Sequence, residues 1–200
     1  MKPTLLFDAD GVIINGKLFS QHLQDDFGIT PTITKTFFTT VFHDCLEGKA
    51  DLRTAIQPHL KEWGWNKDVD SFLKYWFESE QVLDEKLIEL IQAFRSVGIR
   101  CFVATNQEHL RANYMREKMH FNEWFDGVYS SADLGQKKPN IAFFEKLHIE
   151  VGAPDKTTTW FFDDTQKNVD SAKLFGINAR LYTDFDSYQE LVDKEGWLVK

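Results

Sequence analysis

Two pairs of acidic residues directly follow short apolar runs, and no other feature of the sequence is better placed to do chemistry. Asp8 and Asp10 follow Leu-Leu-Phe, and Asp163 and Asp164 follow Trp-Phe-Phe. Residues two apart in an extended backbone point the same way, so Asp8 and Asp10 can face one ligand. Buried neighbouring acids are costly unless they hold a cation or strong donors. Four such carboxylates favour a hard divalent cation, with Mg²⁺ the natural choice beside a phosphate.

Each acidic pair also has a purely structural interpretation. An Asp often ends a strand in a turn, and Gly11 allows a sharp turn after Asp10. Asp163 or Asp164 could cap the amino terminus of a helix while its neighbour stays exposed. Because two acids follow the first apolar run at once, a ligand-binding role is the stronger interpretation for Asp8 and Asp10.

Three more polar residues could bind an anion. Thr105 and Asn106 follow another apolar run and offer a hydroxyl, an amide and backbone N–H groups at an expected helix start. A simple helix cap explains these two residues equally well. Lys138 precedes Pro139 in an expected loop, although a lysine pair such as Lys137 and Lys138 is usually solvated surface.

Apolar runs predict the strands that must position these side chains. They cover Thr4–Phe7, Arg100–Ala104, Gly127–Tyr129, Thr158–Phe162 and Ala179–Tyr182. The first, second and fourth runs are nearly continuous, which is typical of parallel strands covered on both faces. Ligands of open parallel sheets bind at the carboxyl ends of the strands. The polar residues after three of these strands should therefore meet at one edge.

Helical patterns separate the predicted strands. Asp84 is expected to cap a helix that ends before Gly98, and Gly176 suits the end of a later helix. Pro139 suits the first position of the helix that follows Lys138. Strands that alternate with helices predict βαβ units and a mostly parallel sheet.

Residues 15–82 break this alternation. They contain helical patterns at Leu18–Phe27 and Leu73–Ser79 and no convincing strand. We therefore expect a Rossmann-like, doubly wound α/β core formed by residues 1–14 and 83–200. A small helical domain of residues 15–82 would be inserted after the first strand. Aromatic residues expected mostly in the core of this insertion are Trp63, Trp65, Phe72, Tyr75, Trp76 and Phe77.

Composition narrows the classes of protein. A length of 200 residues suits one domain with an insertion, and the formal net charge is −8 without a basic stripe. Nucleic acid is therefore not an expected partner. Cys45 and Cys101 are too far apart for a disulfide framework or a zinc cluster. The amino-terminal apolar run is too short for a secretory signal, and no run approaches the roughly 20 residues of a membrane helix. We expect a cytoplasmic protein of unknown oligomeric state.

Four segments together resemble the motifs of the haloacid dehalogenase-like hydrolases. In chain order they are DADGV, VATN, KKPN and FFDDTQKNVDSA, and they run from Asp8 to about Ala172. The first and fourth motifs are specific in combination, whereas the other two mean little alone. The resemblance implies a doubly wound core with a mobile cap, and residues 15–82 resemble the cap found at the family's first insertion position.

The resemblance implies a role for each acid. Asp8 matches the nucleophile and Asp10 the general acid/base, which relatives also use as a metal ligand through its backbone carbonyl. Asp164 matches the metal-binding acid, with Asp163 as an auxiliary acid at the metal. Asn168 stands where many relatives carry a second acid.

The remaining motif residues imply phosphate binding. Thr105 matches the hydroxyl that binds the phosphate, with Asn106 beside it, and Lys138 matches the catalytic and substrate-binding lysine because it directly precedes the proline. Two departures are visible. Ala9 replaces a commoner large apolar residue, and Asn140 stands where many relatives have Asp.

The expected activity is magnesium-dependent hydrolysis of a small phosphorylated metabolite, such as a sugar phosphate or nucleotide, through an aspartyl-phosphate on Asp8. C–halogen hydrolysis needs no acid for the leaving group, and relatives that perform it lack the second Asp, so Asp10 argues against it. A phosphomutase and a non-catalytic binding protein on the same scaffold stay open as alternatives.

Overall fold

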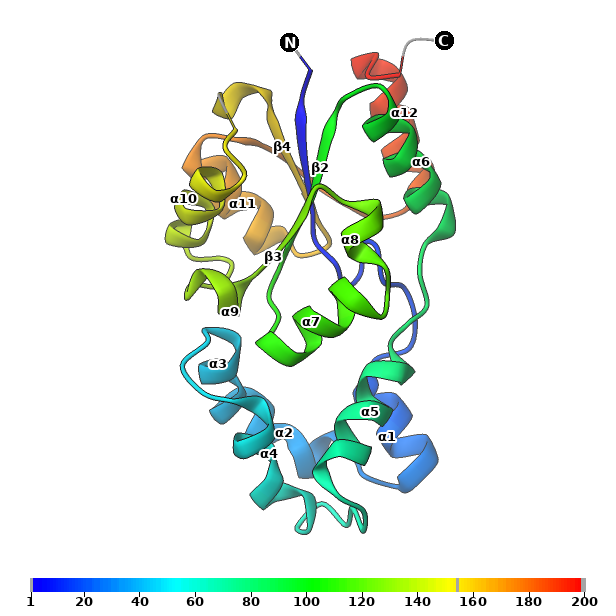
Figure 1. The fold of residues 1–200 in the computed structure, drawn as a ribbon, viewed down its shortest axis with the longest axis vertical. Helices are drawn as coiled ribbons and strands as arrows, with labels where there is room; N and C mark the ends of the chain where they lie inside the picture. Colours follow the sequence, from blue (N-terminus) through cyan, green and yellow to red (C-terminus); the bar gives the residue numbers. More distant parts are fainter. Residues whose placement is uncertain (1, 154, 199–200) are drawn as a thin grey trace.

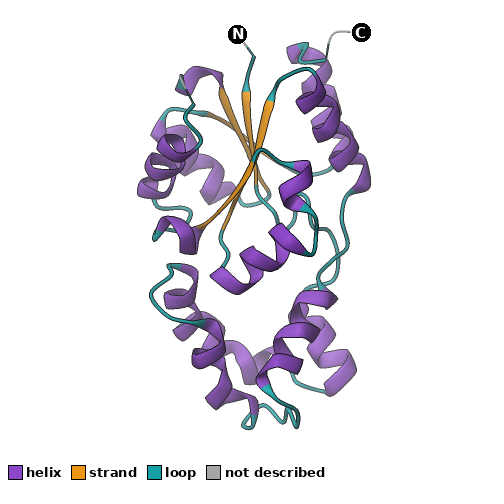
Figure 2. Ribbon diagram, viewed as in Figure 1, coloured by secondary structure: helices purple, strands orange, loops and turns teal. Residues whose placement is uncertain are grey.

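A computed structural model describes residues 2–153 and 155–198 (Figure 1). Within these residues the strands are β1 Thr4–Phe7, β2 Arg100–Thr105, β3 Gly127–Ser130, β4 Thr159–Asp163 and β5 Asn178–Leu181. They form one parallel sheet in the order β3-β2-β1-β4-β5, with β1 at its centre (Figure 2). The predicted doubly wound parallel sheet is confirmed, and each strand boundary lies within one residue of its predicted position.

Helices cover both faces of the sheet (Figure 1). One face carries α6 Glu85–Ser96, α7 His109–Glu117, α8 Phe121–Trp124 and α12 Phe185–Glu195. The other carries α9 Ser131–Leu134, α10 Ile141–Glu150 and α11 Gln166–Phe175. Successive strand residues point to opposite faces, so Leu5 and Phe7 join the first core while Leu6 joins the second. This two-sided burial explains why the strands read as continuous apolar runs.

Two predicted helix ends are confirmed. The Asp84 side chain caps α6 by accepting a hydrogen bond from the Leu87 N–H. Gly176 ends α11 in the left-handed conformation, with φ of 102°. Both ends therefore follow the cap chemistry that the sequence predicted.

Two predicted helix starts are wrong. Pro139 does not open α10, because the Asn140 side chain accepts a hydrogen bond from the Ala142 N–H and makes Asn140 the cap. Thr105 and Asn106 do not stand at a helix start either. Helix α7 begins at His109 and is capped by the carboxylate of Glu108. Asn140 is the better capping residue in the first case. In the second, β2 continues through Thr105, and the Asn106 amide is bonded to the Lys138 backbone instead.

Five helices lie between β1 and α6 and form what we call the helical insertion, residues 15–82. They are α1 Phe19–Phe27, α2 Pro31–Thr39, α3 Val41–Leu46, α4 Leu52–Leu60 and α5 Val69–Ser79. The insertion has its own apolar core, and the aromatic residues predicted for it are buried except for the half-buried Tyr75. None of the helices within residues 2–153 and 155–198 combines the length and apolar character that crossing a bilayer requires.

The chain enters and leaves the helical insertion through paired linkers. Ile14 and Leu83 form an antiparallel bridge, and the Asn15 N–H donates to the Val82 carbonyl over 2.7 Å. The two crossings are therefore side by side, as expected of a unit that is inserted into a sheet domain. We propose residues 1–14 and 83–200 as one domain and residues 15–82 as the other.

Arg111 on α7 joins the sheet domain to the helical insertion. Its guanidinium donates to the carbonyls of Phe77 and Glu80, over 2.7 and 2.6 Å, where α5 ends. The side chain is 1% exposed. Unpaired carbonyls at a helix end are costly when buried, so Arg111 serves as the cap of α5 from another domain.

We expect Arg111→Met to lower the free energy of unfolding by about 2–4 kcal/mol, because two buried carbonyls lose a charged donor. Urea denaturation at 25 °C measures this loss. Arg53→Met is the matched control, since the Arg53 guanidinium pairs with Asp70 on the exposed surface, where ion pairs contribute little. Equal losses in the two variants would contradict the capping role of Arg111.

Candidate active site

The ammonium of Lys138 lies between two carboxylates at the carboxyl edge of the sheet. Its Nζ is 2.8 Å from Oδ2 of Asp8, just after β1, and 2.7 Å from Oδ2 of Asp163, the last residue of β4. The lysine side chain is fully buried. A charge buried this deeply needs close partners of opposite sign, and the two acids provide them.

Two amide side chains hold this arrangement in place. The Asn106 side chain accepts from the Lys138 backbone N–H over 2.8 Å and donates to its carbonyl over 3.0 Å. Asn168 donates to both oxygens of Asp163 at 3.0 Å. Lys137 is only half-buried and takes no part in this cluster. Substrate binding by Asn106 stays a prediction, since its amide is engaged with the loop that carries Lys138.

Asp164 completes a set of three carboxylates with Asp8 and Asp163. One oxygen from each lies within 4.8 Å of the others, which is a fitting donor set for a metal ion. Three carboxylates and one ammonium leave a formal charge of −2. Oxygen donors and this charge suit a hard divalent cation such as Mg²⁺. The Asp10 carboxylate is outside the set.

The surroundings shift the ionisation of this cluster. Burial raises the pKa of Asp8 to about 8, an effect that the Lys138 ammonium opposes and Asp163 reinforces. Burial acts in the same direction on Asp163, but the Lys138 ammonium and hydrogen bonds from Lys138, Asp8 and the Thr165 N–H together hold the pKa of Asp163 below its usual range. Burial disfavours the charged form of Lys138, yet the two carboxylates keep its pKa above the ordinary value. A bound cation would favour the anionic form of Asp8.

Asp10 faces the space between the sheet domain and the helical insertion. Its Oδ2 accepts a hydrogen bond from Nε2 of Gln107 over 2.6 Å. The side chain reaches solvent through this space, but the surrounding protein desolvates it and raises its pKa, against the pull of Arg111 and Lys138. Gln107 was missed from the sequence. Only its position directly after Asn106, the last residue of the second motif, could have pointed to it.

Thr105 is the last residue of β2 and is buried, and β2 pairs directly with β1. Thr105 and Asp8 therefore lie at the same edge of the sheet. All the residues predicted for the site come together at this edge or in the loops that leave it.

A cavity of about 420 Å³ opens over part of this edge. Asp8, Asp10 and Asp164 line it from the sheet domain, and Ser79 and Glu80 line it from the helical insertion. We call it the acidic cavity. Both domains contribute to its walls, so their relative position determines its shape.

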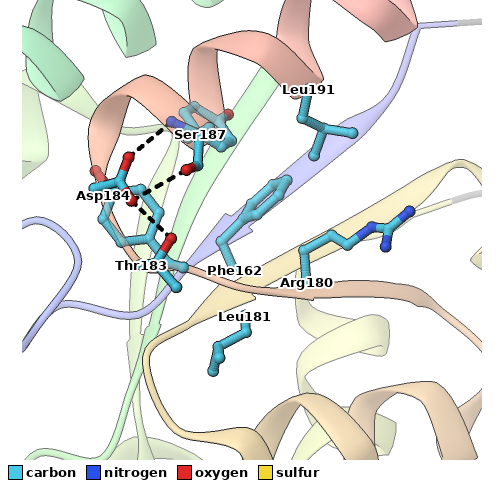
Figure 3. Close-up of a pocket in the computed structure, with 9 residues that line it drawn as sticks. Phe162, Arg180, Leu181, Thr183, Asp184, Ser187 and Leu191 are labelled. Carbon is cyan, nitrogen blue, oxygen red and sulfur yellow. Dashed lines mark hydrogen bonds between the residues drawn. The ribbon is translucent and has the colours of Figure 1, made fainter.

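A smaller cavity of about 220 Å³ lies beside β5 and α12 (Figure 3). Three of its polar residues are bonded to one another: the Asp184 carboxylate accepts from the Ser187 N–H, the Ser187 hydroxyl and the Thr183 hydroxyl. Asp184 thereby caps α12. This local pairing accounts for Thr183, Asp184 and Ser187 without a ligand.

Comparison with known sequences decides the family. The sequence profile of the haloacid dehalogenase-like hydrolases matches residues 2–176. The chain belongs to this family. The expectation drawn from the four motifs is therefore confirmed at the level of the family and of a hydrolase fold.

Two fungal proteins are among the curated relatives. The sesquiterpene phosphatase astK of Aspergillus oryzae is 31% identical over 105 residues, which is 50% of this chain and 51% of the relative. The drimenol cyclase drtB of Aspergillus calidoustus is 31% identical over 70 residues, or 34% of this chain and 13% of the relative. The chain thus spans about half the length of the phosphatase and less of the cyclase.

Solved structures of haloacid dehalogenase-like proteins share the fold across nearly the whole chain. An enzyme of the family from Bacteroides thetaiotaomicron, solved with magnesium and inorganic phosphate, has a TM-score of 0.80 at 17% identity, over 96% of this chain and 99% of its own. A hydrolase-like protein from Porphyromonas gingivalis has a TM-score of 0.79 at 17% identity, over 98% of each chain. At this identity the likeness shows the fold alone.

Gly11 lies against the Asp164 carboxylate, where a side chain would not fit. A Cβ on Gly11 would lie 2.2 Å from the Asp164 Oδ2, and the backbone there has φ of +76°. We expect Gly11→Ala to displace Asp164 and weaken Mg²⁺ binding about tenfold or more, as measured by isothermal titration calorimetry.

Gly28→Ala is the matched control for Gly11→Ala. Gly28 has a similar φ of +69°, but a Cβ there meets no heavy atom of the described residues within 4 Å. Both variants carry backbone strain, and only Gly11→Ala crowds a carboxylate. If both lost Mg²⁺ affinity equally, crowding of Asp164 would not be the cause.

Proposed function

We propose that this chain is a magnesium-dependent phosphohydrolase that cleaves a small phosphate monoester through an aspartyl-phosphate on Asp8. The observation that carries the proposal is the buried Lys138 ammonium shared by Asp8 and Asp163, with Asp164 alongside. The nucleophilic carboxylate and Asp164 line the acidic cavity, and the buried Lys138 ammonium contacts Asp8 directly behind its wall. Phosphoryl transfer requires little beyond such positioning and charge stabilisation.

In the first step an oxygen of Asp8 attacks phosphorus, and the bond between phosphorus and the leaving oxygen breaks. Asp10 gives its proton to that oxygen and releases the alcohol. In the second step Asp10 takes a proton from water, which attacks the phosphorus of the aspartyl-phosphate. Inorganic phosphate leaves and the carboxylate of Asp8 is restored. Thr105 and Lys138 hold the phosphoryl oxygens throughout.

The residues that would hold Mg²⁺ are Asp8, Asp164, the backbone carbonyl of Asp10 and the auxiliary acid Asp163. When bound, Mg²⁺ neutralises charge on the phosphoryl group and on the carboxylates around it. Asp163 also fixes Lys138, so it acts on the site even without direct metal contact.

Asp10 favours phosphate over halide as the leaving group. A halide leaves without a proton, so a dehalogenase has no use for an acid at this position, whereas an alkoxide needs one. The likeness to a curated phosphatase supports the same choice. We further propose that the helical insertion acts as the cap of the site, since Ser79 and Glu80 line the acidic cavity and closure would exclude water.

The first test is release of inorganic phosphate from p-nitrophenyl phosphate by the parent chain and by Asp8→Asn. We expect turnover that needs Mg²⁺, stops with EDTA, and falls roughly a thousandfold or more in Asp8→Asn because the nucleophile is lost. Asp170→Asn is the matched control, since Asp170 is an exposed acid on α11 that pairs with Gln166. Turnover that survives Asp8→Asn would refute the aspartyl-phosphate mechanism.

A second variant tests the acid role of Asp10. We expect Asp10→Asn to slow hydrolysis of an alkyl phosphate by about 10²–10⁴-fold, since an alkoxide leaves poorly without a proton. The loss with p-nitrophenyl phosphate should be much smaller in the first step, because p-nitrophenolate needs no acid. Comparing bursts of p-nitrophenol with rates of alkyl phosphate hydrolysis measures the difference. Equal losses for both substrates would assign Asp10 another role.

A further inference from the structure

A second cavity, of about 530 Å³, adjoins the acidic cavity. The two share the lining residues Asp10, Leu18, Glu80 and Asn106, so they meet at the Asp10 carboxylate. We call this second space the insertion cavity, because helices α1, α2, α3 and α5 supply most of its walls. These helices lie beyond the carboxyl end of β1 in Figure 1.

The walls of the insertion cavity are largely apolar. They include Phe19, Phe38, Phe42, Leu46 and Trp76. Phe38, Phe42 and Leu46 are only half-buried, although they lie within a domain that has a well-formed apolar core. At the junction with the acidic cavity, the Leu18 side chain is 63% exposed. Apolar surface that stays accessible around a concave space marks a binding site.

Polar side chains in this wall are mostly bonded to the protein already. The hydroxyl of Thr39 donates to the Lys35 carbonyl over 2.8 Å within α2. The Glu80 carboxylate accepts from the Phe19 N–H over 2.8 Å and from the indole of Trp76 over 3.0 Å. A sugar or a nucleoside needs convergent polar groups for its hydroxyls. Thr39 and Glu80 are committed elsewhere, and Ser20, Thr32 and Lys35, which also line the cavity, are half-buried or exposed.

We propose that the insertion cavity binds the hydrocarbon part of the substrate, which is the phosphate monoester of a long-chain alkyl or prenyl-type alcohol. The inference rests on the proposed function in one respect, namely that the phosphoryl group sits in the acidic cavity beside Asp8. The leaving oxygen then lies at Asp10, and the carbon chain continues past Leu18 into the insertion cavity. A volume of about 530 Å³ falls within the range of small-molecule sites, roughly 300–1,000 Å³.

The direct test is binding of n-alkyl phosphonates from two to ten carbons, which the enzyme cannot hydrolyse, to the parent chain with Mg²⁺. Isothermal titration calorimetry gives the dissociation constant of each. We expect each added methylene to tighten binding about threefold until the cavity is full, because each buried methylene leaves water. A dissociation constant that does not change with chain length overturns the proposal.

Two neighbouring residues on α3 provide the matched variants. Phe42 lines the insertion cavity, whereas Val41 is 37% exposed and does not line it. Phe42→Gln should flatten the dependence on chain length, and Val41→Gln should leave it as in the parent. Thermal melting followed by circular dichroism establishes that both variants are folded. A chain-length dependence that survives in folded Phe42→Gln, or is lost in Val41→Gln, counts against this cavity as the site.

A turnover series separates this inference from the proposed function. We expect hydrolysis of n-octyl phosphate with a kcat/KM at least about a hundredfold above that of glucose 6-phosphate. Turnover of glucose 6-phosphate that equals or exceeds that of octyl phosphate would overturn the hydrocarbon assignment and keep the phosphatase. Phosphonate binding that tightens with chain length, without turnover of any phosphate ester, would keep the cavity assignment and overturn the phosphatase.

Discussion

The buried ammonium of Lys138 is the interaction on which the rest of the site depends. It lies within 2.8 Å of Asp8 and 2.7 Å of Asp163, and its side chain has no contact with solvent. Such a group is tolerated only when its partners are in place, so the β1–β4 pairing and the loop that carries Lys138 must be formed together. Asn106 and Asn168 supply the hydrogen bonds that make the arrangement unique. The carboxylates outnumber the ammonium, and the negative charge that remains suits a divalent cation.

The two domains contribute different parts of the site. The sheet domain carries Asp8, Asp163 and Asp164 at the carboxyl ends of β1 and β4, and Lys138 in the loop between α9 and α10. The helical insertion adds none of these groups but provides most of the wall of the insertion cavity. Arg111 and the paired linkers define how the two domains meet. In the function we propose, the sheet domain therefore carries out the reaction, and the helical insertion selects the leaving group.

The comparisons establish the family and the fold, whereas the residues of the site support phosphate chemistry. Structures at about 17% identity establish the fold, and a fold of this kind supports several chemistries. The match to the curated phosphatase covers only about half of that protein's length. The case for phosphate chemistry thus comes from the acids themselves. In the function we propose, Asp10, which is held by Gln107 at the junction of two cavities, separates this site from one that expels a halide.

The sequence alone was enough to predict the parallel sheet and the inserted helices, and it singled out the acids that the structure brings together, because each of these features has a local pattern. Strands buried on both faces are continuous apolar runs, and the acids follow them directly. Local patterns could not show that Asn106 holds the Lys138 loop, since the two residues are 32 positions apart. They also misplaced the starts of α7 and α10, where Glu108 and Asn140 are the caps. The insertion cavity was invisible for a related reason: its aromatic residues look like core in the sequence. Only the packing of α1, α2, α3 and α5 against one another decides which of those side chains line an open space.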